Sequence, residues 1–344
     1  MVSEETQPTR KPSKPDWLKD LMPYQKADLK KSLWQLTHTL IPYFALLVWM
    51  VYTVQQGYSY WLTLALAVPA GGLLVRIFIF FHDCGHGSFF AQRWANTLVG
   101  YITGILTFTP YEDWRHAHGI HHAAAGNLDK RGVGDVLTLT VAEYLALPRL
   151  QRLGYTLFRN PFIMFGLGPA FIFLLSSRLP GKRTTAAGRR SVFITNSALL
   201  VIIAVSSLTI GLRTYLLVQL PVILIAAGMG VWLFYVQHQF VGVYWARQET
   251  WDAVRASLEG SSYYRLPGVL RWFTGNIGLH HIHHLRPRIP NYNLQACYDA
   301  IPEVRAVKPL TLRASLASLR LNLWDETAQR LVSFSDLRRM RVKA

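Results

Sequence analysis

Residues 76–90 read RIFIFFHDCGHGSFF, and this stretch decides most of the interpretation. Apart from Arg76, its first six residues are apolar, and they complete an apolar segment that begins near Tyr60. His82 and His86 follow directly, four positions apart. Residues at this spacing share one face of a helix, so both imidazoles can point at one metal ion. The stretch therefore predicts a membrane span with a metal site at its end.

Two further histidine clusters repeat this spacing later in the chain. Residues 116–122 read HAHGIHH and residues 280–284 read HHIHH, so ten of the twelve histidines fall in three short segments. One metal ion takes roughly four to six ligands, so eight or nine imidazoles suit two metals. A single cluster could be solvated surface, but three with one spacing favour a binding site. The candidate ligands from the clusters are His82, His86, His118, His121, His122, His280, His283 and His284.

The other histidines need separate interpretation. His238 ends the last long apolar stretch, at the predicted depth of the first cluster, where a buried ionisable group is expected to be functional. We interpret it as a ninth ligand, with an interfacial histidine as the alternative. His116 and His281 lie off the shared faces and are expected behind the ligands or in solvent. His38 stands alone near the start of the first span and is interpreted as interfacial.

Composition indicates a membrane protein. Hydrophobic residues make up 51% and charged residues 16% of the 344, with mean hydropathy +0.18; soluble domains carry about 25% charged residues. The net charge of +17 suits an anionic membrane face and an acidic protein partner better than nucleic acid, because half the chain is apolar. Cys84 and Cys297 form no disulfide framework or metal motif. No cleavable signal peptide is expected.

Four stretches are long enough to cross a bilayer core of about 30 Å at about 1.5 Å per residue. Two more are apolar, but one is short and the other has a Gly-Leu-Gly-Pro break. The four are residues 36–54, 60–81, 192–211 and 214–237, and the two doubtful ones are residues 95–109 and 161–177.

The distribution of basic residues predicts the orientation. The N-terminal arm carries seven Lys or Arg up to Lys31 and the loop at 178–190 carries five, whereas the connection at 55–59 carries none. The positive-inside rule places the arm and that loop in the cytosol. This requires both doubtful stretches to enter the membrane and return on the same side. The termini and all three clusters then lie on the cytosolic side of the plasma membrane.

The expected fold is therefore all-α: a polytopic membrane helix bundle with four full crossings, two re-entrant apolar hairpins and a cytosolic helical cap that carries a di-metal site. We expect one domain over residues 1–344. It comprises a basic arm at 1–33, spans with the first two clusters at 36–237, and the cap with the third cluster at 238–344. Near the end of the cap, residues 315–325 are expected to form an amphipathic helix.

The three clusters resemble the histidine boxes of the membrane fatty acid desaturase family: His-x3-His followed twice by His-x2-His-His, in this order. The similarity extends beyond the boxes to residues 127–135 (NLDKRGVGD), 230–240 (GVWLFYVQHQF) and 274–285 (TGNIGLHHIHHL). The chain looks most similar to bacterial acyl-lipid desaturases that act on membrane phospholipids.

The resemblance implies two iron ions held by the box histidines, with His238 matching a ninth histidine. It implies dioxygen as co-substrate, two electrons, and a cis double bond formed in an acyl chain. Animal acyl-CoA members have an asparagine one turn before the ninth histidine, but here that residue is Phe234. Asn276, one turn before His280, could support the ligands from behind, or it could be a helix N-cap.

The chain has no His-Pro-Gly-Gly signature of a fused haem carrier. Electrons are therefore expected from a separate acidic carrier, ferredoxin or flavodoxin. Two other readings stay open. Hydroxylases, alkane monooxygenases and carotene ketolases share similar boxes, and a membrane metal transporter or sensor would also use clustered histidines. A transporter, however, places its ligands near the middle of the membrane.

Overall fold

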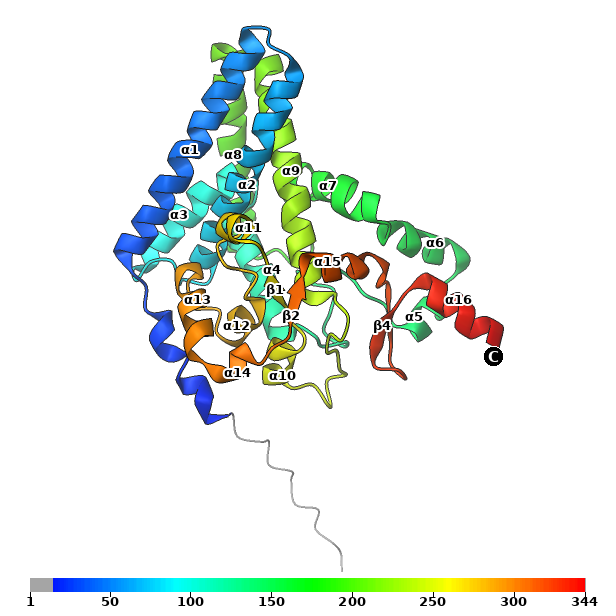
Figure 1. Ribbon diagram of the computed structural model, residues 1–344. Coiled ribbons are helices and arrows are strands. Elements are labelled where there is room, and N and C mark those ends of the chain that lie inside the picture. The colour runs from blue at the N-terminus through cyan, green and yellow to red at the C-terminus, as the bar shows by residue number, and fades with distance from the viewer. Residues whose placement is uncertain (1–14, 344) are drawn as a thin grey trace, which may run out of the picture.

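A computed structural model describes residues 15–343, so residues 1–14 of the predicted basic arm lie outside the described part. Two 3-10 turns, Asp16–Lys19 and Met22–Gln25, precede the first helix. Four long helices form a slender bundle (Figure 1): α1 (Leu29–Gln55), α2 (Tyr60–Gly85), α8 (Ala186–Thr209) and α9 (Leu212–His238). Each has 24 to 27 residues and is long and apolar enough to cross a membrane. The four predicted spans are therefore present as helices.

Helix α2 lies at the centre of the bundle. In its most apolar window 67% of the residues are buried, compared with 17% in α8. Glycines let neighbours approach α2 closely: a Cβ added at Gly71 would lie 2.7 Å from Ile225 of α9, and one at Gly72 would lie 2.9 Å from Phe273. Small residues at helix contacts are typical of membrane bundles. The packing fixes the position of the histidines at the end of α2.

The first doubtful stretch, residues 95–109, is a single helix rather than a hairpin. It corresponds to α3 (Arg93–Leu106), which packs against α2 and is followed by a turn and α4 (Tyr111–Ala124). The chain leaves the region of His86 along α3 and comes back to it along α4. That this excursion enters a membrane and returns on one side stays a prediction.

The second doubtful stretch, residues 161–177, is also one helical run. After α5 (Val141–Ala146) and α6 (Arg149–Phe158) the chain continues as a π-helix (Ile163–Leu167), α7 (Gly168–Leu174) and a 3-10 turn (Ser176–Arg178). This run is bent by 64° against α6, so the break falls before the predicted Gly-Leu-Gly-Pro site. Pro169 stands in the first turn of α7, where its missing N–H is tolerated. That residues 161–177 enter a membrane and return on the same side likewise stays a prediction.

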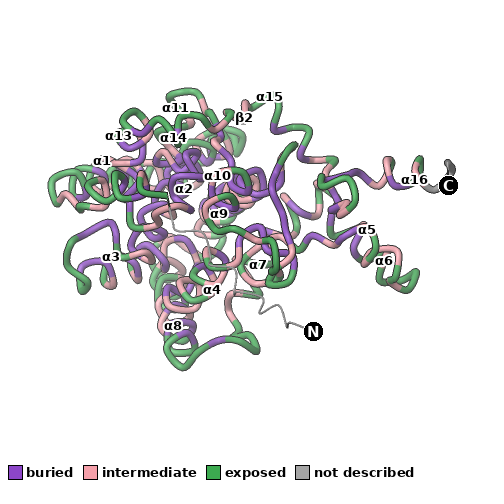
Figure 2. Tube along the Cα trace, turned by 90° about the horizontal axis from the view of Figure 1, so that it is seen from below, coloured by how far each residue is buried: buried purple, intermediate pink, exposed green. Residues whose placement is uncertain are grey.

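The C-terminal third gathers at one end of the bundle (Figure 1). Seen from below, buried residues gather around α2, α9 and α10, and α16 extends to the side (Figure 2). Two small sheets interrupt the mostly helical fold: β1 (Tyr263–Arg265) pairs in parallel with β2 (Pro309–Thr311), and β3 (Leu323–Asp325) pairs antiparallel with β4 (Arg330–Val332). Its helices are α10 (Ala253–Leu258), α11 (Gly268–Phe273), α12 (His280–Leu285), α13 (Asn291–Ala300), α14 (Pro302–Arg305), α15 (Leu312–Ser315) and α16 (Phe334–Lys343).

The predicted amphipathic helix at 315–325 is wrong. A 3-10 helix (Leu316–Arg320) follows α15, and the chain then extends into β3. The physical reason lies in two contacts from other elements. The hydroxyl of Tyr235 donates to carbonyls of this segment, and the guanidinium of Arg159 donates to the carbonyl of Leu321 at 2.6 Å. These contacts hold the carbonyls of the segment toward other elements, and Trp324, in strand β3 itself, is buried.

Candidate metal centre

Four helices bring the nine candidate ligands to one region. On α2, α4 and α12, histidines that are three or four residues apart are neighbours on the helix surface. The shortest of these helices, α12, is anchored by Ile282, whose side chain is fully buried. The candidate ligands come from α2 (His82, His86 at its C-cap), α4 (His118, His121, His122), α9 (His238) and α12 (His280, His283, His284).

The nine imidazoles form two groups. Within each group, one nitrogen of every ring lies within 4.8 Å of a nitrogen of the others. The groups are adjacent, because the rings of His122 and His284, one from each group, stack with centroids 4.2 Å apart. Helices α4 and α12 contribute to both groups, so a His-x2-His-His cluster does not face a single site. The first group is His82, His86, His118, His122 and His283; the second is His121, His238, His280 and His284.

Burial keeps the grouped imidazoles of α4 and α12 neutral. Loss of solvent, together with the neighbouring imidazoles, holds the pKa of His118, His121 and His283 well below its usual range. A neutral imidazole keeps one nitrogen lone pair free for a metal ion. These three rings therefore offer lone pairs rather than positive charges.

The hydrogen bonds of His238 show which of its nitrogens is free. Its Nδ1 lies 3.2 Å from the carbonyl oxygen of Gly260, which only accepts, so Nδ1 carries the proton. Its unprotonated Nε2 lies 3.1 Å from Nε2 of His121 and 3.0 Å from Nε2 of His280. The Nε2 atoms of His121, His238 and His280 therefore converge, and a single proton among them cannot form hydrogen bonds with all three.

The donor set fits a pair of transition-metal ions. The Nε2 of His86 is buried and has no hydrogen-bond partner in the described part of the chain. A metal ion among these rings would bind it and the converging nitrogens together. All the donors are imidazoles, which bind iron, zinc, copper and nickel. The residues thus fit iron without selecting it.

Asp83 is a functional candidate that the sequence reasoning missed. Its Oδ1 accepts a hydrogen bond of 3.1 Å from Nδ1 of His82. Its Oδ2 accepts from the backbone and side-chain nitrogens of Asn291, at 2.7 and 2.9 Å. A carboxylate that holds the far nitrogen of a ligating histidine fixes the ring and its tautomer. The signal was present in the sequence, since Asp83 directly follows His82.

Asn276 was predicted to support a candidate ligand from behind, but it contacts Asn291, the residue that holds Asp83, instead. Its side chain donates to the carbonyl of Asn291 at 3.2 Å, and none of its hydrogen bonds reaches a histidine of either group. The alternative prediction, that Asn276 is the N-cap of the helix, is wrong, because the N-cap of α12 is Leu279. Asn276 has φ of 58°, a left-handed conformation that asparagine tolerates. Its contact supports the backbone that holds Asp83.

The remaining histidines belong to neither group. His281 is buried rather than solvated, and its Nε2 donates to the carbonyl of Val304 at 3.0 Å. His116 is exposed on α4, which agrees with the second of its two predicted positions, in solvent. His38 is half-buried on α1, 5.6 Å from the ring of Trp272.

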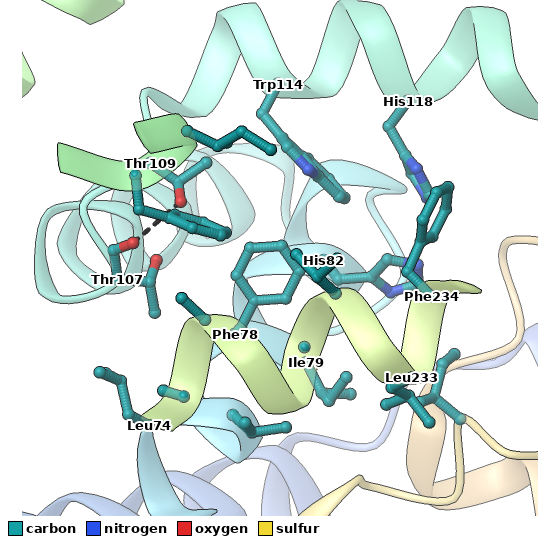
Figure 3. Close-up of a pocket in the computed structure, with 18 of the residues that line it drawn as sticks. Leu74, Phe78, Ile79, His82, Thr107, Thr109, Trp114, His118, Leu233 and Phe234 are labelled. Carbon is teal, nitrogen blue, oxygen red and sulfur yellow. Dashed lines mark hydrogen bonds between the residues drawn. The ribbon is translucent and has the colours of Figure 1, made fainter. Parts of the chain in front are cut away.

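An apolar cavity of about 260 Å³ leads along α2 and α9 to both groups. In Figure 3, Leu74 and Thr107 lie at one end, and His118 and Phe234 lie at the other. His280 of the second group also lines the cavity. Its shape and lining suit a long apolar chain placed beside the two groups.

The model of the fatty acid desaturase family matches residues 59–314, a range that contains all nine candidate ligands. The chain belongs to the fatty acid desaturase family. The resemblance carried by the three histidine boxes is therefore confirmed.

Curated relatives agree with this assignment. This desaturase is 47% identical to a fatty acid desaturase of Bacillus subtilis, over 94% of this chain and 92% of the relative. It is 27% identical to an sn-1 acyl-lipid omega-3 desaturase (ferredoxin) of Nostoc, over 82% of each chain. It is 27% identical to an sn-1 oleoyl-lipid 12-desaturase of Synechocystis, over 68% of this chain and 66% of the relative. The protein is an oxidoreductase that desaturates fatty acyl chains.

Proposed function

We propose that this desaturase holds two iron ions on its nine grouped histidines and inserts a cis double bond into the acyl chains of membrane phospholipids, with dioxygen as co-substrate. The observation that carries the proposal is the apolar cavity that ends against histidines of both groups. An acyl chain in this cavity would present one C–C bond to both metals at once.

The division of work between metal and protein follows from the chemistry. When bound, the irons supply the oxidation of an unactivated C–H bond, which no side chain can perform. The protein positions the reactants. Asp83 and the carbonyl of Gly260 each hold the Nδ1 proton of a histidine, which turns the Nε2 lone pair toward the metal. The aromatic walls from Phe78 and Phe234 exclude water and keep the acyl chain extended.

The substrate and electron donor are proposed from the relatives and from charge. Two relatives are named for acyl-lipid or oleoyl-lipid substrates, and one name includes ferredoxin. The net charge of +17 suits an acidic carrier, ferredoxin or flavodoxin. We place the protein in the plasma membrane, with both termini and the metal centre on the cytosolic side, in line with the basic N-terminal arm and the basic loop at 178–190.

Expression in a bacterium that lacks unsaturated lipids tests the function. Gas chromatography with mass spectrometry of the membrane lipids should show acyl chains lighter by two hydrogens, with one double-bond position. His82→Ala and His280→Ala should abolish these products. His116→Ala, an exposed histidine on α4 outside both groups, should not. Hydroxylated products would instead indicate a hydroxylase, and unchanged lipids with normal protein levels would refute the proposal.

A further inference from the structure

A second cavity, of about 400 Å³, lies against α1, α2 and α11. It shares no lining residue with the apolar cavity that leads to the metal groups. Lys31, Arg76 and Arg271 line it together with His38, and within residues 15–343 no aspartate or glutamate does. The cavity is therefore strongly cationic, in contrast to the apolar one.

Arg76 is the most unusual residue of this cavity, because it is a charged residue within a spanning helix. Only 4% of its surface is exposed. Its Nε donates to the hydroxyl of Thr39 at 3.1 Å, and its Nη1 donates to the carbonyl of Trp272, whose ring centre lies 4.4 Å from the guanidinium carbon. These partners are neutral, and Arg76 forms no ion pair with a carboxylate in the described chain. A buried charge without a counter-ion is costly, so the site calls for an anion.

Two further cations face the same space, and neither has a carboxylate partner among the described residues. Lys31 Nζ donates to the side-chain oxygen of Asn293 at 3.1 Å, and Arg271 Nη1 donates to that of Gln295 at 3.2 Å. Amide partners fix the direction of both side chains but leave their positive charges uncompensated. The lining thus combines one buried and two more accessible cations on three different helices.

We propose that this cavity binds a phosphate group, carried by a phospholipid headgroup or by a free phosphate ester. Guanidinium and ammonium groups arranged around one space match the several acceptor oxygens of a phosphate. The aromatic lining favours the lipid source. Trp34 is 67% exposed at the start of α1, and tryptophan at this depth is typical of the membrane–water interface. A lipid held here is distinct from the acyl chain in the other cavity, so the proposal does not depend on the desaturase reaction.

Binding measurements on the purified full chain in detergent test the proposal. The probes are phosphatidylglycerol, diacylglycerol, which has no phosphate, and inorganic phosphate. The variants are Lys31→Gln and Arg271→Gln, whose side chains are accessible enough to be replaced without unfolding the core; Arg76→Gln is added if it folds. Lys30→Gln is the matched control, because it removes the same charge from an exposed neighbour outside the cavity.

Wild type and Lys30→Gln should bind phosphatidylglycerol, with dissociation constants about tenfold lower than those of Lys31→Gln and Arg271→Gln. Diacylglycerol can enter only the apolar cavity, so wild type, Lys31→Gln and Arg271→Gln should bind it equally. Displacement of the lipid by millimolar inorganic phosphate would identify free phosphate as a ligand, whereas failure to displace it would assign the site to the lipid headgroup. Equal binding of phosphatidylglycerol by all four proteins, or an equal loss of diacylglycerol binding in Lys31→Gln and Arg271→Gln, would overturn the proposal.

Discussion

The Nε2 atom of His238 lies 3.1 Å from the Nε2 atom of His121, although the two residues are 117 positions apart in the chain. This contact separates two interpretations that the sequence left close together. An interfacial histidine at the end of α9 would be solvated, but His238 is 8% exposed and belongs to the second group. The position of its ring supports its assignment as the ninth ligand.

Replacement of this residue by glutamine should therefore remove metal. His238→Gln keeps hydrogen bonding to Gly260 but replaces an imidazole by an amide, a poor ligand for iron. We expect the loss of at least one iron per chain and of most activity. Iron analysis of the purified protein measures this, with His116→Gln as the control on α4. Full iron content and activity in His238→Gln would leave a centre of eight histidines.

Asp83→Asn should lower the metal affinity of the first group, although all five of its histidines are still present. The amide cannot accept as a carboxylate does from both His82 and Asn291, so the ring of His82 loses its fixed orientation. Loss of such a supporting carboxylate typically reduces metal affinity about 10- to 100-fold. Iron retention during titration with a chelator measures the effect. Asp299→Asn, an exposed aspartate on α13, serves as the control, and equal retention in both variants would contradict the role of Asp83.

Ala227→Leu should shorten the apolar cavity. Ala227 is buried in the wall of this cavity, 11 positions before His238. This separation corresponds to about 16 Å along α9 at about 1.5 Å per residue. Added bulk should select against the longest acyl chains, by about 10- to 200-fold for a change of one methylene. Competition between acyl lengths, read by gas chromatography, measures this. Ala204→Leu, exposed on α8, should leave chain-length preference unchanged, and no shift in Ala227→Leu would show that the chain binds elsewhere.

Electron transfer from an acidic carrier should slow as the salt concentration rises. The Debye length falls from about 10 Å at 0.1 M to about 3 Å at 1 M, which screens attraction to a protein of charge +17. Stopped-flow reduction by ferredoxin at subsaturating concentration should therefore lose rate steeply between these conditions. Reduction by a small neutral reductant provides the control, because it should keep its rate. A ferredoxin rate independent of salt would argue against electrostatic docking.

Single cysteines should report the predicted sidedness. Ala187→Cys near the start of α8 and Arg265→Cys in β1 are exposed, and both should react only after the membrane is opened to the cytosolic side. Gln56→Cys, in the connection between α1 and α2, should react from outside. The native cysteines, Cys84 and Cys297, are buried and should give little background. External labelling at position 187 or 265 would refute the predicted orientation.

Local rules predicted the parts of this protein that depend on local geometry. Helical spacing correctly indicated that His82 and His86 lie together, because positions in a helix fix relative direction. Apolar length likewise predicted the four long helices. The same rules could not divide the histidines of α4 between two groups, since that division depends on where the fold places α4 relative to α9 and α12.

Long-range contacts account for what the sequence did not indicate. Asp83 and Asn291 are 208 positions apart, so nothing near either residue predicts their hydrogen bond. The helix predicted at 315–325 failed because Tyr235 and Arg159, from other parts of the chain, bind its carbonyls. His38 was interpreted as an isolated interfacial residue, whereas the fold places it beside Arg76 in a cationic cavity.

The shared ligand helices have a consequence for how the enzyme matures in the cell. Both α4 and α12 contribute rings to each group, so an ion captured by one group also orders the helices that carry ligands of the other. Uptake of the first ion should then raise the affinity for the second, and half-loaded protein should be scarce. With iron as the proposed metal, a cell starved of iron would accumulate a mixture of empty and complete enzyme, and desaturation would fall in proportion to the complete fraction.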